Sequence, residues 1–265
     1  MGYSRQYYYK QKKDHTKRNQ QEEAVLQLVL SERKLLPRVG ARKLLHMIEP
    51  KLVSSGLRFG RDRLFELLRR KDMLVRPVRR YQQTTMSRHW MKKYPNLTKD
   101  FSASAPDELW VSDITYIQAR DGTSYLNLVT DAFSRRIVGH AVYDSMEASL
   151  MVRALDMAIK HRRNSNNVST IHHSDRGLQY CSQHYTDRAD KHNIRRSMTE
   201  NSDPYENALA ERMNRTIKEE FGFYAKSLSR KDLPALVAQA VHLYNTKRPH
   251  LALNYKTPDE VYRHH

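Results

Sequence analysis

The stretch IHHSDRGLQY, residues 171–180, decides how the fold of this chain is interpreted. Residues 169–173 form a short run typical of a β-strand, and Asp175 follows where that run ends. Gly177, two places later, allows the chain to turn sharply away. The sequence therefore predicts a carboxylate at the carboxyl end of a strand.

Two further acidic residues lie in equally regular patterns. WVSDITYI, residues 110–117, places Asp113 in the middle of an earlier strand, and YENALAERMNRTIKEEF, residues 205–221, places Glu211 on an amphipathic helix. Because 29 of the 265 residues are acidic, a fixed spacing between acids is weak evidence by itself. The surroundings of each acid have to carry the interpretation.

The surroundings of Asp113 are apolar. Strand alternation puts its side chain on the same face as Leu109, Val111 and Ile117. A lone charge is costly to bury there. Metal coordination would offset that cost, and so would a hydrogen bond to a neighbouring hydroxyl or arginine. This strand alone leaves both explanations open.

The composition indicates a globular protein of one large or two small domains, since 39% of its residues are hydrophobic and only 8 are glycine. The single cysteine, Cys181, excludes a disulfide framework and a multi-cysteine zinc site. No apolar run approaches the roughly 20 residues of a membrane span, and the first residues contain no signal-peptide core. We therefore expect a soluble cytoplasmic protein with no membrane partner.

The positive charge is concentrated at the front of the chain. Residues 1–105 contain 25 Lys and Arg against 9 Asp and Glu, whereas residues 106–265 contain 22 against 20. Such a segment is typical of proteins that bind nucleic acid. A solubilising tail or a membrane-surface segment would also be basic, but the helical pattern of the segment argues against a tail.

The basic front divides into three expected parts. Residues 1–19 have little that could form a core and are expected to be a flexible basic arm. Residues 20–80 predict three helices, the first two ended by Pro37 and Pro50, and hence a helix-turn-helix DNA-binding domain. Residues 81–105, with Trp90, are expected to be a basic linker that either lies along DNA or simply joins two domains. The last predicted helix would enter the major groove, and its candidate DNA contacts are Arg61, Arg63, Arg69 and Arg70.

Residues 106–265 predict an α/β domain. Three strands form an antiparallel meander, Ser145 caps a helix over 146–161, and the order then continues strand, helix, strand, helix, helix. This order describes a mixed sheet with helices on its faces. The first strand and the strand after the first helix would lie side by side and parallel, which would bring Asp113 and Asp175 together.

The helix of Glu211 adds a third carboxylate. Glu211, Arg215 and Lys218 share a face apart from its apolar stripe. That face could be an ordinary ion pair, or a metal ligand with cations that bind phosphates. Three carboxylates suit Mg²⁺ or Mn²⁺, and a pair of such ions supports phosphodiester chemistry. His172 and His173 could add ligands, although histidines on strands more often have structural roles.

These motifs together resemble a known family. HSDRGLQY, the aspartate of WVSDITYI, the 35 residues between Asp175 and Glu211, and the closing YNTKRPHLALNYKTPDEVY are similar to the transposases of bacterial insertion sequences in the insertion-sequence-three group. The resemblance runs from about residue 20 to the end. It implies an RNase H-like catalytic core similar to that of retroviral integrase, with Asp113, Asp175 and Glu211 as a metal-binding DDE triad.

The same resemblance implies what the protein acts on. Its partners would be the terminal inverted repeats of the insertion sequence and target DNA, held by at least two protomers, and the pathway would pass through a circular intermediate. The upstream-frame segment typical of this group, with its own helix-turn-helix and leucine zipper, is not found as a separate segment, so the upstream-frame protein is a further expected partner. A nuclease that cuts without joining and a catalytically silent DNA-binding repressor remain the alternatives.

Overall fold

The computed structural model describes residues 5–76, 93–145, 148–163, 169–200, 206–225 and 227–264. The chain divides into two compact units, Met1–Pro77 and Val78–His265. Each unit has its own hydrophobic core, and each is described separately below.

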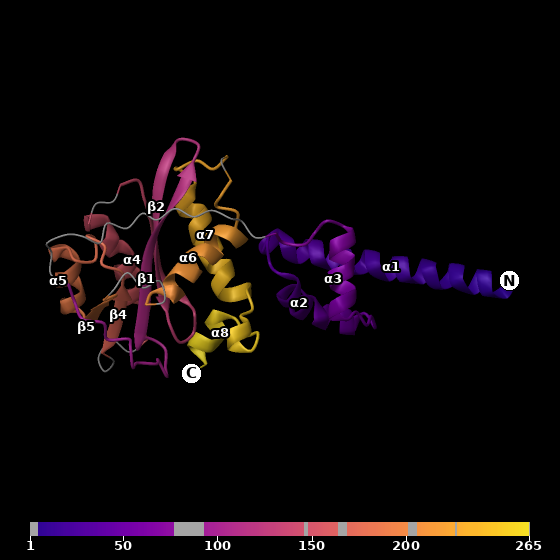
Figure 1. Cartoon of the computed structure of the whole chain (residues 1–265), viewed down its shortest axis with the longest axis horizontal. Helices are drawn as coiled ribbons and strands as arrows, with labels where there is room; N and C mark the ends of the chain where they lie inside the picture. Colours follow the sequence, from indigo (N-terminus) through magenta and orange to yellow (C-terminus); the bar gives the residue numbers. More distant parts are fainter. Residues whose placement is uncertain are drawn as a thin grey trace. The chain divides into compact units, whose positions relative to one another are not determined.

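The first unit is a three-helix domain composed of α1 (Arg5–Leu35), α2 (Ala41–Ser54) and α3 (Arg61–Arg70). The second half of α1 packs through Val25 and Val29 onto the apolar faces of the other two helices. Those faces bury Leu44, Ile48, Leu52, Leu64, Leu67 and Leu68. The three predicted helices are therefore present in this unit (Figure 1).

The described part of the expected flexible arm is helical, because α1 begins at Arg5; residues 1–4 lie outside the described residues. Neither glycine nor proline occurs between residues 3 and 36, and neighbouring turns are joined by bonds such as Gln11 Nε2 to Tyr7 Oη at 2.7 Å. Low hydrophobicity excluded a core for this segment, but it did not exclude a helix.

Proline ends the first helix as predicted but not the second. Pro50 lies inside α2, which continues to Ser54. The continuation buries Leu52 one turn beyond Ile48, so packing offsets the hydrogen bond that proline removes. The helix ends instead near Gly56, whose φ is +65°, with the Leu57 N–H bonded to the Leu52 carbonyl at 2.9 Å.

The second unit contains a mixed sheet whose strand order is β3-β2-β1-β4-β5. Strands β1 to β3 are antiparallel neighbours, whereas β1, β4 and β5 are parallel. The predicted order of strands and helices is confirmed, with a 3-10 turn and a short helix added at the end. The bounds are β1 (Leu109–Ala119), β2 (Gly122–Asp131), β3 (Ile137–Tyr143), α4 (Ala148–His161), β4 (Thr170–Ser174), α5 (Gln183–Lys191), β5 (Ile194–Met198), α6 (Ala208–Glu220), α7 (Leu233–Lys247), η1 (Leu251–Leu253) and α8 (Pro258–Arg263).

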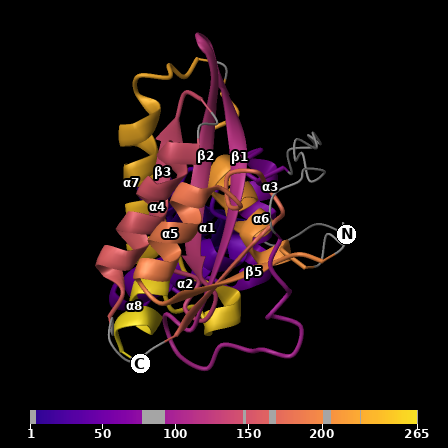
Figure 2. The same ribbon diagram turned by 90° about the vertical axis from the view of Figure 1, so that its left-hand side faces the viewer.

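Helices cover both faces of this sheet. Figure 1 shows α4 and α5 on one side and α6 and α7 on the other, and a separate apolar cluster lies beneath each pair. Figure 2 shows the β1–β2 hairpin projecting beyond the rest of the sheet. Helix α4 lies very close to β3, since a Cβ added to Gly139 would be 2.0 Å from the Ala154 carbonyl oxygen. The predicted cap of this helix involves residues 146 and 147, which lie outside the described residues.

Part of the expected linker belongs to the second unit. The backbone N–H of Leu97 donates to the Ser197 hydroxyl at 2.8 Å, and the Asn96 amide donates to the Glu206 carboxylate at 3.3 Å. Residues 93–105 therefore lie against the rest of the second unit instead of forming a free linker. Residues 81–92, including Trp90, lie outside the described residues.

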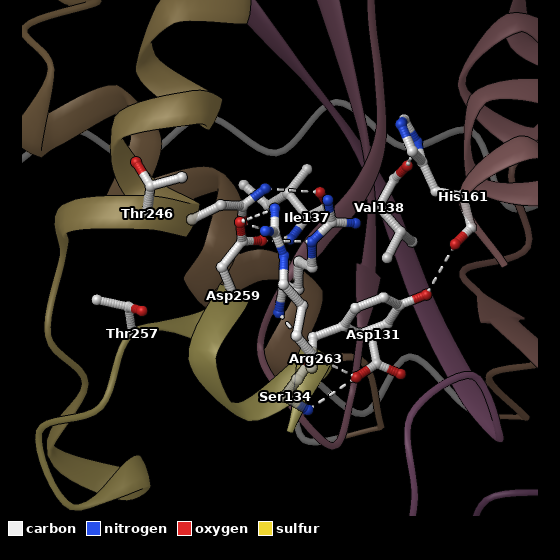
Figure 3. A network of polar contacts seen from close by, with 12 residues as sticks. Asp131, Ser134, Ile137, Val138, His161, Thr246, Thr257, Asp259 and Arg263 are labelled. Atoms are coloured by element: carbon white, nitrogen blue, oxygen red, sulfur yellow. Dashed lines mark hydrogen bonds and ion pairs between the residues drawn. The ribbon is translucent and has the colours of Figure 1, made fainter. Parts of the chain in front are cut away.

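A buried polar network fastens the C-terminal segment to this domain (Figure 3). The Tyr262 hydroxyl donates to the Asp107 carboxylate at 2.8 Å, and Asp131 accepts from the Asp107 N–H at 2.8 Å. Arg136 bonds Asp259 at 2.6 Å across the same region. The motif that closes the sequence thus has a structural role. Among the described helices, none has the length and apolar character needed to cross a membrane.

Candidate active site

The parallel pairing of β1 and β4 brings two of the predicted site residues together. Their register pairs Ser112 with Ser174, so the next residue along each strand is Asp113 and Asp175 respectively. Both carboxylates therefore lie at the carboxyl end of the parallel pair, which is where open α/β sheets generally bind ligands. The predicted proximity of these two strands is confirmed.

Helix α6 aligns its polar stripe with the same stretch of β1. The Asn207 amide donates to the Ser112 carbonyl at 3.0 Å, and the Asn214 amide donates to the Asp113 carbonyl at 3.1 Å and to its carboxylate at 2.9 Å. Residues 207, 211, 214 and 218 share one helix face, so Glu211 lies on the stripe between the two asparagines. The helix thereby holds all three predicted carboxylates in one region.

The electrostatics of Asp113 reflect this crowding. Burial, followed by the negative charge of Asp175, raises its pKa from 3.8 to about 7, with a smaller contribution from Glu211. The hydrogen bond from Asn214 opposes the rise. Burial likewise raises the pKa of Glu211, and Arg215 opposes that rise. The site therefore resists holding its full negative charge unless a cation is present.

The turn after β4 orients Asp175. The Gly177 N–H donates to the Asp175 carboxylate at 3.0 Å. A Cβ on Gly177 would lie 3.0 Å from that same oxygen. The glycine is therefore required for its close approach to the carboxylate, and its φ is not among the positive values of this chain.

Lys218 does not share the outward face predicted for Glu211 and Arg215. Its side chain is buried against β1 and donates to the Thr115 hydroxyl at 3.1 Å and to the Tyr116 carbonyl at 2.7 Å. Burial lowers its pKa to about 8. The expectation of an exposed cation at this position is wrong, because hydrogen-bond acceptors on β1 and the rings of Tyr116 and Tyr224 draw the ammonium inward.

The two histidines of β4 are held by structural hydrogen bonds. His172 contacts the Ser112 hydroxyl at 2.7 Å, and burial lowers its pKa to about 3. His173 Nε2 bonds the Glu206 carbonyl at 3.0 Å, and Nδ1 bonds the Ser197 hydroxyl at 2.8 Å. Since a carbonyl only accepts, Nε2 must carry the proton. His173 thus holds Glu206, two residues before α6 begins, and the structural interpretation of both histidines is supported.

The donor chemistry of the site suits a hard divalent cation. All candidate ligand atoms are carboxylate oxygens, and the buried Asn214 Oδ1 beside them has no hydrogen-bond partner among the described residues. Within those residues, no group of three His, Cys, Asp or Glu side chains is already gathered tightly enough to hold an ion. Glu211, which is exposed, is the member that would have to move inward.

Comparison with known proteins agrees with this geometry. Two family models, each described as "Integrase core domain", match residues 103–204 and 192–258. The transposase InsF for insertion sequence IS3A of Escherichia coli (strain K12) is 32% identical over 211 residues, which cover 79% of this chain and 73% of the relative. The insertion element IS600 uncharacterized 31 kDa protein of Shigella sonnei is 30% identical over 213 residues, covering 80% and 78%. The chain belongs to the IS3-type insertion-sequence transposases.

Family membership makes the chain a transposase, an enzyme of the polynucleotidyl-transferase class. The cryo-EM structure of a simian T-cell lymphotropic virus intasome with the PP2A regulatory subunit B56 gamma has a TM-score of 0.53 and 18% identity, covering 85% of this chain and 71% of that chain. This likeness concerns the fold alone, and it agrees with the RNase H-like, integrase-type core predicted from the sequence.

The four arginines predicted to contact DNA differ in the partners that their side chains already have within the first unit. Arg61, Arg69 and Arg70 are exposed on α3, and Arg61 is paired with the neighbouring Asp62 at 2.8 Å. Arg70 is paired with Glu22 of α1 at 2.8 Å, and Arg63 lies over the ring of Phe59 at 4.5 Å. The last two therefore help to hold the first unit together. DNA contact by any of the four stays a prediction.

Two site residues were not predicted from the sequence. Asn207 and Asn214 were available as a polar stripe seven residues apart, adjacent to the apolar stripe of Met213 and Ile217. Asparagine has many roles, so this stripe becomes informative only once β1 is known to lie beneath it.

Proposed function

We propose that this transposase binds the ends of its insertion sequence and catalyses metal-dependent DNA cleavage and strand transfer with Asp113, Asp175 and Glu211. The observation that supports the proposal is the parallel β1–β4 pairing, which brings the strand positions of Asp113 and Asp175 together beneath the helix that carries Asn214 and Glu211. Membership in the transposase family supplies the reaction class.

The three carboxylates would hold Mg²⁺ or Mn²⁺, as a pair of ions. When bound, such ions polarise the phosphodiester and favour an in-line displacement at phosphorus. Asn214 fixes the carboxylate of Asp113, and Gly177 N–H fixes that of Asp175. Lys218 holds β1 against α6 one turn further along. These contacts orient Asp113 and Asp175, and Glu211 would complete the ligand set by moving inward.

The reaction has two displacements at one site. In the first, water attacks the phosphodiester at the element end, the P–O bond to the 3′ oxygen breaks, and a free 3′-hydroxyl leaves. In the second, this hydroxyl attacks a phosphodiester of another strand, so that one P–O bond forms as another breaks. Because both steps are in-line attacks at phosphorus, the same residues can serve each.

DNA is held by cations in both units. Arg61 and Arg69 of α3 are exposed candidates in the first unit, and Arg215, exposed four residues after Glu211, is the candidate in the second. Two element ends require at least two protomers, and the upstream-frame protein is a further candidate partner. Target DNA is the second substrate.

An assay with end-labelled element DNA tests this function. Wild-type protein with Mg²⁺ or Mn²⁺ should yield strand-transfer products as well as a cleaved end. Hydrolysis without joining would favour the nuclease alternative. Tight binding without either reaction, in both metals, would favour the repressor.

A further inference from the structure

A cavity of about 600 Å³ lies on the α6 side of the sheet. Its walls come from the segment before β1, from Leu109 and Val111 of β1, from the loop after β2 and from the first turn of α6. Val111 precedes Asp113 by two residues on the same strand face, a separation of roughly 7 Å. The cavity therefore adjoins the proposed catalytic carboxylates, although none of them lines it.

Arg135 in this cavity is an unusual residue. Its φ is +64°, a left-handed conformation that side chains other than glycine rarely adopt. Two bonds hold it there, from its own N–H to the Asp131 carbonyl at 2.9 Å and from the Tyr244 hydroxyl to its carbonyl at 3.1 Å. Strained backbone held in this way is often found where a side chain is aimed at a ligand.

The guanidinium of Arg135 lacks a partner for its charge. Among the described residues it makes no hydrogen bond or ion pair, and burial lowers its pKa. Arg212 of α6 lies near enough to lower that pKa further, while Asp131, the acid whose charge acts on Arg135, is already bonded to the Ser134 N–H at 2.7 Å. A half-buried cation without a counter-ion is unfavourable, and a bound anion would relieve it.

The first turn of α6 adds donors to the same wall. Asn207, Ala208 and Leu209 line the cavity, and the Asn207 side chain does not cap the helix. Free N–H groups at the start of a helix of this length favour an anion beside them. The acid among the described lining residues is Glu206, whose carboxylate is engaged by the Glu200 N–H at 2.7 Å and the Asn96 amide at 3.3 Å.

Part of the remaining wall is apolar and aromatic, and the rest carries the polar side chains of Asn96, Thr98, Lys99, Ser102 and His173. Phe101 and Phe133 lie with Leu109, Val111 and Ala132 around the cavity. A phosphate alone would leave most of this volume empty, whereas pockets of this size usually hold molecules as large as a nucleotide. Aromatic side chains also provide stacking surfaces for bases without regard to sequence.

We infer that this cavity binds one nucleotide of the DNA strand next to the scissile phosphate, with its phosphate at Arg135 and the start of α6 and its base against Phe101 and Phe133. The inference rests on the proposed function, because it is DNA in the active site that would place a nucleotide here. It assigns Arg135 a role in holding the strand and none in the chemistry.

The test measures binding of deoxyadenosine monophosphate, the probe, to the full chain by equilibrium dialysis. Divalent metal is left out. Arg135→Asn removes the cation while keeping a residue that tolerates positive φ. The matched control is Arg195→Asn, a change at an exposed arginine on the edge strand β5. Thermal unfolding of both variants checks that each is folded.

Arg135→Asn should weaken binding of the probe about tenfold or more, whereas Arg195→Asn should leave its affinity within about twofold of wild type. Deoxyadenosine, which lacks the phosphate, should bind wild type more weakly than the probe does. A short single-stranded oligonucleotide should compete with the probe, as expected for a site that serves DNA. Failure of wild type to bind the probe, or equal binding by folded Arg135→Asn, would overturn the inference. Because metal is absent, neither result depends on cleavage or joining.

Discussion

The proposed catalytic carboxylates of this transposase have neighbours that oppose their ionisation and neighbours that favour it. Asp113 is the clearest case, since burial and Asp175 raise its pKa to about 7 while Asn214 donates to it at 2.9 Å. A divalent ion would reverse this balance by favouring the charged form. Under the proposed function, ionisation of Asp113 would therefore be coupled to metal binding.

The first prediction concerns stability and pH at Asp113. Because its native pKa lies above the unfolded value, its contribution to stability is fully present below about pH 4 and is lost as the pH rises through about 7. Without metal, wild type should therefore lose stability relative to Asp113→Asn between pH 4 and 8, by roughly 4 kcal/mol at most. Urea unfolding of both proteins with a chelator present measures the difference.

Magnesium should restore most of this loss at pH 8 in wild type and little in Asp113→Asn, because the ion binds the native carboxylates. A stability difference between the two proteins that stays constant from pH 4 to 8 would contradict the assignment of the raised pKa to Asp113.

At the scale of elements, α6 acts as a clamp on β1. Asn207, Asn214 and Lys218 bond successive positions of the strand, from Ser112 to Tyr116. The register of these bonds, more than any single contact, sets Glu211 on the helix face that carries Asn207 and Asn214. It also explains why Lys218 is turned inward.

The second prediction tests the clamp. Asn214→Ala removes the amide that orients Asp113, and should lower the rate of strand transfer by roughly 10- to 100-fold, as is common for residues that orient metal ligands. The apparent Mg²⁺ requirement should rise with it. Glu219→Gln, five residues along the same helix, is the control and should change neither quantity by more than about twofold. A marked fall in the thermal unfolding temperature of Asn214→Ala would instead indicate damage to the fold.

The sequence predicted the elements of the catalytic domain well, because alternation and helical periodicity are local properties. It also predicted that Asp113 and Asp175 would be neighbours, since strand order follows from connection rules. It did not predict the direction of Lys218, the helical state of residues 5–19 or the continuation of α2 through Pro50. Those depend on acceptors and apolar surfaces supplied by other parts of the chain.

Asp131 shows the same limit. From the sequence it is an acidic control away from the site, but its buried carboxylate bonds Ser134 and the Asp107 N–H, and burial raises its pKa to about 6. Its amide variant would disturb the network that holds α8. Asp187, exposed on α5, is the better control.

In the whole molecule, the net positive charge lies mainly in the first unit, and the proposed catalytic carboxylates lie in the second. Residues 1–77 contain 19 Lys and Arg against 8 Asp and Glu, a net of +11, and the remaining residues supply +7 of the total of +18. The structure places the boundary before the segment 93–105, which is bonded to the catalytic domain. A truncation at residue 105 would therefore damage that domain.

The third prediction follows from this boundary. A chain of residues 78–265 should remain folded, yet bind end DNA much more weakly and with a shallower dependence on salt than the full chain, because +11 of the net charge of +18 is gone. Binding measured at several salt concentrations gives both slopes. Equal affinity and equal slope for the two proteins would contradict the assignment of DNA binding to the first unit.

The central claim, that Asp113, Asp175 and Glu211 form one metal-dependent catalytic site, is tested most directly by strand transfer of labelled element ends by the three amide variants. Asp113→Asn, Asp175→Asn and Glu211→Gln should each abolish both cleavage and joining in Mg²⁺ while retaining DNA binding, because each keeps its shape and loses a ligand charge. Asp187→Asn should remain active. An active Glu211→Gln protein would contradict the third ligand, and loss of DNA binding in all three variants would show that these carboxylates support the fold instead of the reaction.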